Sequence, residues 1–149
     1  MKALVQRVSE GGVYIESENY GEEIGRGMVI LLGIKTGDTP EDVDFVAGKC
    51  CNLRIFEDSE EKMNLSLNDI NGEVLIISQF TLYGDARRGN RPSFIEAARP
   101  EEAIPLYEKF VMRVKEKLGG GRVRTGKFGA MMRVKIINDG PVTIMVESK

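Results

Sequence analysis

The most constraining feature of this sequence is a run, residues 74–85, that starts as a buried strand and ends in polar side chains. Val74–Ile77 is apolar and mostly β-branched, which is typical of a strand covered on both faces. Ser78, Gln79 and Thr81 follow before the apolar pattern has ended. Polar groups at a buried strand end cost free energy unless they are hydrogen-bonded. These side chains therefore either bond to neighbouring backbone or line a pocket.

A second irregularity lies near the C-terminus. Gly140-Pro141 separates two segments with strand character, Met131–Ile137 and Val142–Val146, which we expect to form a hairpin. Proline cannot donate a hydrogen bond to a sheet, so this position must be an edge, a bulge or a special turn. An ordinary tight turn is one interpretation, and a part in the same active site as Ser78–Thr81 is the other.

The order of elements predicts one mixed α/β domain over residues 1–149, with a curled, largely antiparallel sheet and two main helices. One helix is expected to begin at Pro40 with Thr39 as its N-cap, because proline suits the first helical position. The second is expected from Pro100 to Leu118, where a run of glycines ends it. The other expected strands are Lys2–Ser9 and Gly12–Glu16, joined by a turn at Glu10-Gly11-Gly12, and the central strand Gly27–Ile34.

The composition disfavours several classes of protein. The chain has no histidine, which removes the commonest general base, the commonest metal ligand and every nucleophile–histidine pair. We expect no metal and no cofactor. Cys50 and Cys51 are adjacent and are expected to be reduced thiols in or near the core. No apolar stretch has the length of a membrane span and the start does not fit a signal peptide, so we expect no membrane partner and a cytoplasmic location.

The charge is unevenly distributed along the chain. The net charge is −2, but residues 86–135 hold 13 Lys and Arg against 5 Asp and Glu. A basic surface of this kind can follow a phosphate backbone. A solvated helix face with a few ion pairs would have the same composition, and the sequence leaves both interpretations open.

Two short motifs, Ser78-Gln79-Phe80-Thr81 and Gly140-Pro141-Val142-Thr143, occur intact in this chain. Either could occur by chance, but the pair, at this separation and in a chain of this length, resembles the D-aminoacyl-tRNA deacylases. These enzymes remove D-amino acids from mischarged tRNA. The resemblance covers essentially the whole chain, and includes Val5–Val8, Leu53–Phe56, Lys62–Leu67 and Thr125–Ala130.

The resemblance implies a homodimer with its active sites at the subunit interface. It implies that the pocket is lined by Ser78, Gln79, Phe80 and Thr81. Main-chain amides around Gln79 and Phe80 would form an oxyanion site, and the Thr81 hydroxyl would lie close to the scissile ester. It also implies that the Gly140-Pro141 bond is cis and reaches into the partner's pocket as a chiral filter, with Arg7 bracing the loop. The alternative for Arg7 is an ordinary surface or ion-paired strand residue.

This chemistry is compatible with the residues. An aminoacyl ester is an activated acyl group, so it needs a held carbonyl, donors aimed at the oxyanion and a positioned water. The ribose 2′-hydroxyl of the terminal adenosine could orient that water without a histidine. A neutral threonine is a poor nucleophile without a base, so an orienting role is expected for Thr81. A filter that recognises only the chirality of the α-carbon would accept many D-amino acids. Glycine is achiral, so such a filter would not exclude it.

Two rival functions remain open on the sequence alone. One is a non-catalytic tRNA-binding homodimer that uses the basic stretch. The other is a general esterase, against which the lack of a nucleophile elbow or histidine triad counts.

Overall fold

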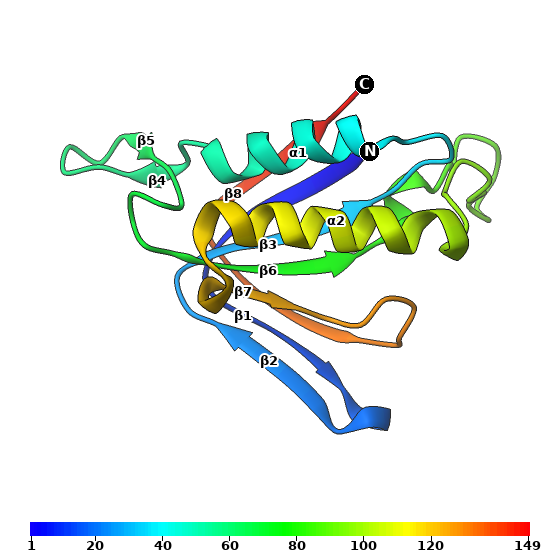
Figure 1. Ribbon diagram of the computed structural model, residues 1–149, viewed down its shortest axis with the longest axis horizontal. Helices are drawn as coiled ribbons and strands as arrows, with labels where there is room; N and C mark the ends of the chain where they lie inside the picture. The colour runs from blue at the N-terminus through cyan, green and yellow to red at the C-terminus, as the bar shows by residue number, and fades with distance from the viewer.

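The computed structural model describes residues 1–149 and consists of a twisted mixed sheet with two helices side by side on one face (Figure 1). The strands are β1 (Lys2–Ile15), β2 (Tyr20–Ile24), β3 (Gly27–Gly33), β4 (Phe56–Glu57), β5 (Met63–Leu65), β6 (Glu73–Ser78), β7 (Val123–Thr125) and β8 (Arg133–Glu147). The helices are α1 (Pro40–Asn52) and α2 (Pro100–Leu118), with short 3₁₀ turns η1 (Glu16–Glu18), η2 (Phe80–Tyr83) and η3 (Gly120–Arg122).

The long strand β1 organises the sheet. Its first half pairs antiparallel with β3 and its second half with β2, while β8 runs antiparallel along its other edge. Beyond β3 the sheet continues with β6 and β7, both in parallel pairing. The sheet curls so far that β2 approaches β7, where the Tyr20 hydroxyl donates to the Thr125 carbonyl at 2.8 Å. The predicted mixed α/β class with a curled sheet and two main helices is confirmed.

Two predicted turns are wrong. Glu10-Gly11-Gly12 is not a turn, because β1 passes through it as one continuous strand. The hairpin expected around Gly140-Pro141 is also absent, since both of its expected arms, from Arg133 onward, belong to β8 and pair with β1. The register jumps there from Val8 opposite Asn138 to Gln6 opposite Thr143, so residues 139–142 form a bulge.

Gly11 and Gly12 of β1 are explained by close packing and not by a turn. A Cβ added at Gly11 would lie 2.9 Å from Val29 Cγ2, and one at Gly12 would lie 2.9 Å from the Tyr14 hydroxyl. The neighbour of Gly11 lies on β3 and that of Gly12 lies two residues further along β1, and in both places only glycine leaves room.

The core lies on both faces of the sheet. A cluster of 25 buried residues fills the space between the sheet and the two helices, and 6 more pack inside the curl on the opposite face. The β6 run Val74–Ile77 contributes to both, with Val74 and Ile76 in the first cluster and Leu75 and Ile77 in the second. The prediction of a strand covered on both faces is therefore confirmed.

α1 begins where it was expected, and α2 both begins and ends where it was expected. Thr39 caps α1: its hydroxyl accepts from the Asp42 N–H at 3.4 Å, and the Asp42 carboxylate accepts from the Thr39 N–H at 2.8 Å. α2 spans Pro100–Leu118 and ends at Gly119, whose φ of 91° suits glycine. Neither helix is long and apolar enough to cross a membrane. Cys50 and Cys51 are buried and free, as predicted.

Candidate active site

The candidate site forms where β6 leaves the core. The side chains of β6 are buried from Val74 to Ile77, those of Ser78 and the following Gln79 are half-buried, and those of Phe80 and Thr81 are exposed. The Gln79 N–H donates to the Leu32 carbonyl at 2.8 Å, which extends the β3–β6 pairing by one residue. η2 then starts at Phe80 and turns the chain out of the sheet. The polar motif therefore stands at the open end of a buried strand.

A cavity of about 450 Å³ lies beside this strand end. Its walls come from the ends of β3 and β6, the beginning of α2, and the segment that leads into β8. The lining includes Ser78, Gln79 and Phe80 from the motif, and Phe128, Met131 and Met132 from the opposite wall. None of the lining residues carries an ionisable side chain. Any acid–base chemistry in this pocket must therefore come from main-chain groups, hydroxyls or the bound substrate.

The main-chain donors at the strand end are not equivalent. The Gln79 N–H is engaged by Leu32, so it is not available to a developing oxyanion. Phe80 is the first residue of η2, and the first N–H groups of a helix lack partners within the helix. The Gln79 side chain also has a role, because its amide Nε2 donates to the Thr81 hydroxyl oxygen. The sequence gives no reason to distinguish the two main-chain amides, and only the strand pairing separates them.

Arg7 and the bulge of β8 form a second cluster. Arg7 is buried, with 7% of its surface exposed. Its Nε donates to the Asp139 carbonyl and its Nη1 to the Ile55 carbonyl, both at 2.8 Å. Its remaining nitrogen, Nη2, lies 3.9 Å from a carboxylate oxygen of Glu57. The guanidinium thus ties the bulge at Gly140 to the segment that follows α1.

The bulge itself is held by main-chain and side-chain hydrogen bonds. The Gly140-Pro141 peptide bond is cis, as expected, and Gly140 has a φ of 141°. The Asn138 side chain accepts from the Val142 N–H at 2.7 Å and donates to the Thr143 hydroxyl at 3.0 Å. A Cβ at Gly140 would meet Val142 Cγ2 at 2.8 Å and Arg7 Nη2 at 3.0 Å. Gly140 and Pro141 remain exposed while the bulge around them is braced.

Within one chain the two motifs are far apart. Gly140 lies opposite Arg7, which pairs with Met28, which in turn pairs with Val74 of β6. Ser78 is four residues further along β6 and three strands across from the bulge, so the separation is roughly 13 Å along the strand and roughly 14 Å across the sheet. The structure brings Arg7 and the bulge together, but not the bulge and Ser78–Thr81 of the same chain.

The segment after η2 is a loop that no sequence motif connects with the site. We call Asp85–Ser93 the arginine loop, because it carries Arg87, Arg88 and Arg91. Its ends are joined by two main-chain hydrogen bonds between Asp85 and Ser93, at 2.8 and 2.9 Å. Hydrogen bonds from the Arg87 side chain and N–H lower the pKa of Asp85 to about 2. Immediately after the loop, the Phe94 ring packs edge-on against Phe80, with 5.2 Å between ring centroids.

Together, the curled α/β sheet, the pocket without ionisable side chains and the polar strand end define a class of α/β protein whose pocket has only main-chain, hydroxyl and amide groups for polar contacts. Comparison with known proteins makes the assignment specific. Residues 4–147 match the family described as D-Tyr-tRNA(Tyr) deacylase. The chain belongs to this family.

Individual relatives support this assignment over the whole chain. A D-aminoacyl-tRNA deacylase of Thermotoga petrophila is 55% identical over 148 residues, which is 99% of this chain and 97% of that protein. One of Geobacillus sp. (strain WCH70) is 53% identical, over 100% of this chain and 96% of that protein.

Two solved structures have the same fold. One, named "c-Myc DNA Unwinding Element Binding Protein", is 40% identical with a TM-score of 0.93, and the match covers 100% of this chain and 99% of that chain. A probable eukaryotic D-amino acid tRNA deacylase has a TM-score of 0.84 over 97% of both chains. At 20% identity, this second likeness concerns the fold alone.

Proposed function

We propose that this protein is a D-aminoacyl-tRNA deacylase that hydrolyses the ester bond between a D-amino acid and the terminal ribose of tRNA. Family membership over residues 4–147 supports the reaction. The observation that carries the proposal is the pocket at the end of β6, which Phe80 at the start of η2 lines and whose lining has no ionisable side chain. An ester that is already activated needs little more than a held carbonyl and a positioned water.

The proposed reaction uses the substrate as well as the protein. Water attacks the ester carbonyl, the carbonyl oxygen becomes an oxyanion, and the bond to the ribose oxygen breaks. The products are the free D-amino acid and tRNA with its terminal hydroxyl restored. The Phe80 N–H is our candidate donor to the oxyanion, and one such donor is worth roughly 3 kcal/mol in the transition state. The neighbouring ribose hydroxyl orients the water, and Thr81 helps to position the ester.

The same site must refuse L-aminoacyl-tRNA. A preference of about 10⁴-fold corresponds to about 5.5 kcal/mol of differential binding. A soft apolar wall discriminates by only about 1–3 kcal/mol per methylene, so a stiff barrier is needed. Gly140-Pro141 is our candidate for the barrier, because it is exposed and is braced from behind by Arg7 and Asn138. Glycine is achiral at its α-carbon, so this barrier would not exclude it, and glycyl-tRNA is a candidate substrate.

We propose further that the barrier is supplied by a second copy of the chain. The separation of the bulge from Ser78–Thr81 within one chain supports this, since the bulge cannot cover its own pocket. The active form is then a homodimer in which Gly140 and Pro141 of the partner subunit close each site. We also propose a cytoplasmic location, where tRNA is charged; the free, buried thiols Cys50 and Cys51 fit a reducing compartment.

A non-catalytic nucleic-acid-binding homodimer is the second candidate. The observation that favours it is the 40% identity to a solved structure whose name is that of a DNA-element binding protein. Such a protein would bind tRNA without regard to the attached amino acid and would not hydrolyse it. A general esterase would instead cleave small activated esters as readily as aminoacyl-tRNA.

One assay separates these functions: the protein is incubated with D-Tyr-tRNA, with L-Tyr-tRNA and with a small activated ester. We expect rapid release of D-tyrosine only. Equal cleavage of both hands would refute the chiral filter, and cleavage of neither would favour the binding protein. Pro141→Ala should cleave L-Tyr-tRNA measurably or lose activity on D-Tyr-tRNA, with little loss of stability. A variant with full activity and full selectivity would exclude Pro141 from the filter.

A further inference from the structure

We propose that the arginine loop, Asp85–Ser93, binds the phosphates of the nucleotides next to the terminal adenosine and so holds the acceptor end of tRNA over the pocket. This inference rests on the proposed function, because it names the surface that the same site uses for the rest of its substrate.

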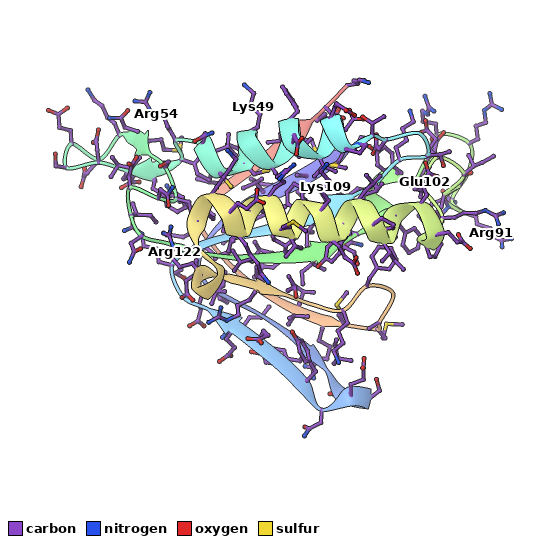
Figure 2. The ribbon with its side chains drawn as sticks, viewed as in Figure 1. Lys49, Arg54, Arg91, Glu102, Lys109 and Arg122 are labelled. Carbon is purple, nitrogen blue, oxygen red and sulfur yellow. The ribbon has the colours of Figure 1, made fainter.

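The loop has cations that the protein itself does not use. Arg87 is committed to Asp85, with a nitrogen–oxygen distance of 2.7 Å. Arg88 and Arg91 take part in none of the ion pairs or side-chain hydrogen bonds of the protein, and both are exposed. With Asp85 and Ser93 they line a hollow of about 500 Å³ that has no apolar residue. Figure 2 shows Arg91 pointing away from the body of the protein, at the end where α2 begins.

Two carboxylates that follow the loop have partners outside it. The Glu96 carboxylate lies 3.1 Å from the Lys35 ammonium group. The Glu102 carboxylate accepts from the Gly37 N–H at 2.8 Å. Because Asp85 is also occupied by Arg87, neither Arg88 nor Arg91 has a carboxylate partner within ion-pair distance. The hollow is therefore suited to an anion with several acceptor oxygens, and guanidinium groups match phosphate geometry well.

The position of the loop indicates which kind of anion binds there. Asp85 follows Thr81 by four residues, so the start of the loop lies at most about 14 Å from the site. At its other end, Phe94 packs on Phe80. Both ends of the loop are thus anchored at the mouth of the pocket. An ester held in the pocket is attached to the last nucleotide of an RNA strand, so the preceding phosphates must pass close to this mouth. A polyanion that runs out of the pocket fits the loop better than a free small anion.

The test compares a whole substrate with its last nucleoside. The double variant Arg88→Ala/Arg91→Ala is assayed on D-Tyr-tRNA and on the D-tyrosyl ester of adenosine, and its affinity for uncharged tRNA is measured separately. We expect KM for D-Tyr-tRNA to rise about tenfold or more, kcat to stay unchanged, and the adenosine ester to be cleaved as by the wild type. The slope of log affinity against log salt should decrease by about 1.4–1.8, as for two lost phosphate contacts.

Two further variants control for charge and folding. Arg88→Lys/Arg91→Lys keeps both cations and should retain most of the affinity for tRNA. Lys115→Ala/Lys117→Ala removes two exposed cations from the last turn of α2, about 22–26 Å along that helix from its start, and should change nothing. An unchanged KM in the alanine double variant, or an equal loss on both substrates, would overturn the inference. If the wild type cleaves neither substrate, the proposed function fails, and the affinity for uncharged tRNA still decides the role of the loop.

Discussion

Arg7 is the residue on which the shape of the β8 bulge depends most directly. It is buried and satisfies the carbonyls of Asp139 and Ile55. Arg7→Met would leave both carbonyls without their partner, so we expect the free energy of unfolding to fall by about 2–3 kcal/mol, measured by urea denaturation. Selectivity for D-Tyr-tRNA over L-Tyr-tRNA should decrease in the fraction that remains folded.

Arg133→Met is the matched control for Arg7. The Arg133 side chain is 78% exposed and its ion pair with Glu16 is equally exposed. Exposed pairs contribute little to stability, so a change within about 0.5 kcal/mol is expected. If Arg7→Met were as mild as this control, the brace that we assign to the guanidinium would be wrong.

Thr81 tests whether a side chain takes part in the chemistry. Its hydroxyl accepts from the Gln79 amide and faces no base among the lining residues of the pocket. We therefore expect Thr81→Ala to retain kcat/KM within about tenfold of the wild type, with the loss mainly in KM and with an unchanged pH profile. Thr81→Ser should restore the wild-type value. A complete loss of kcat in a folded Thr81→Ala variant would make the hydroxyl a direct participant.

At the level of elements, the sequence predicts what depends on local patterns. The limits of α2 and the Thr39 cap of α1 follow from periodicity, capping residues and glycine stops. The continuity of β1 and β8 cannot be predicted in this way. A glycine pair or a Gly-Pro pair has the same local signature in a turn and in a curled strand. Only the close approach of neighbouring strands at Gly11 distinguishes the two, and that approach depends on residues far away in the chain.

Gly11→Ala tests this explanation. The added methyl would lie 2.9 Å from Val29 Cγ2 and 3.3 Å from the Lys135 carbonyl oxygen. Overpacking of this kind costs about 1–3 kcal/mol, so we expect a loss of that size in the free energy of unfolding. Gly120→Ala is the control, because a Cβ there would meet nothing within 4 Å. Equal stability of the two variants would mean that β1 can relax around the methyl group.

The first turn of α1 makes stability depend on pH. Burial of the Asp42 carboxyl on its own raises its pKa, but hydrogen bonds from Thr39 and Ser148 and the nearby Lys149 ammonium outweigh burial and lower it from 3.8. A group whose pKa is lowered on folding stabilises the protein above its unfolded pKa. That contribution is lost as the pH falls through the folded value. We expect the free energy of unfolding to decrease below about pH 4.

Asp42→Asn isolates this contribution from those of other aspartates. The variant should be less stable than the wild type at neutral pH, and its stability should fall less on acidification. The comparison is made by urea denaturation at a series of pH values. Parallel pH curves for the two proteins would assign the acid sensitivity to other carboxylates, such as Asp58, whose pKa is lowered by main-chain hydrogen bonds from Lys62 and Glu60.

At the level of the whole molecule, the sequence identifies the parts of the site but not their arrangement. The motifs at Ser78–Thr81 and Gly140-Pro141 are recognisable as residues. Their separation within one chain follows only from the strand registers of the folded sheet. Two further features also depend on the fold. The Gln79 N–H is engaged in strand pairing, and Phe94 contacts Phe80. A site completed by a second subunit is therefore a hypothesis about assembly, and it requires a test on the assembled protein.

Thiol cross-linking between two differently labelled chains is such a test. A Thr81→Cys chain and a Pro141→Cys chain are mixed, allowed to exchange subunits and treated with a short bifunctional thiol reagent. The native thiols are a silent background: burial raises the pKa of Cys50, and raises that of Cys51 to about 11, so both are poorly reactive. We expect a covalent product of twice the chain mass of 16.6 kDa in the mixture and little from either chain alone.

A third chain makes the expectation specific to the site. Met112 is 55% exposed on α2 and lies nine residues, about 14 Å along the helix, beyond the pocket residue Ala103, so a Met112→Cys chain should not cross-link to the Pro141→Cys chain through a short reagent. Sedimentation of the untreated protein gives the mass independently of chemistry. A monomer in solution, or equal cross-linking of Pro141→Cys to positions 81 and 112, would exclude a filter supplied by the neighbouring subunit. The pocket at the end of β6 would then have to select its substrate with residues of its own chain, and the β8 bulge of that chain lies three strands away.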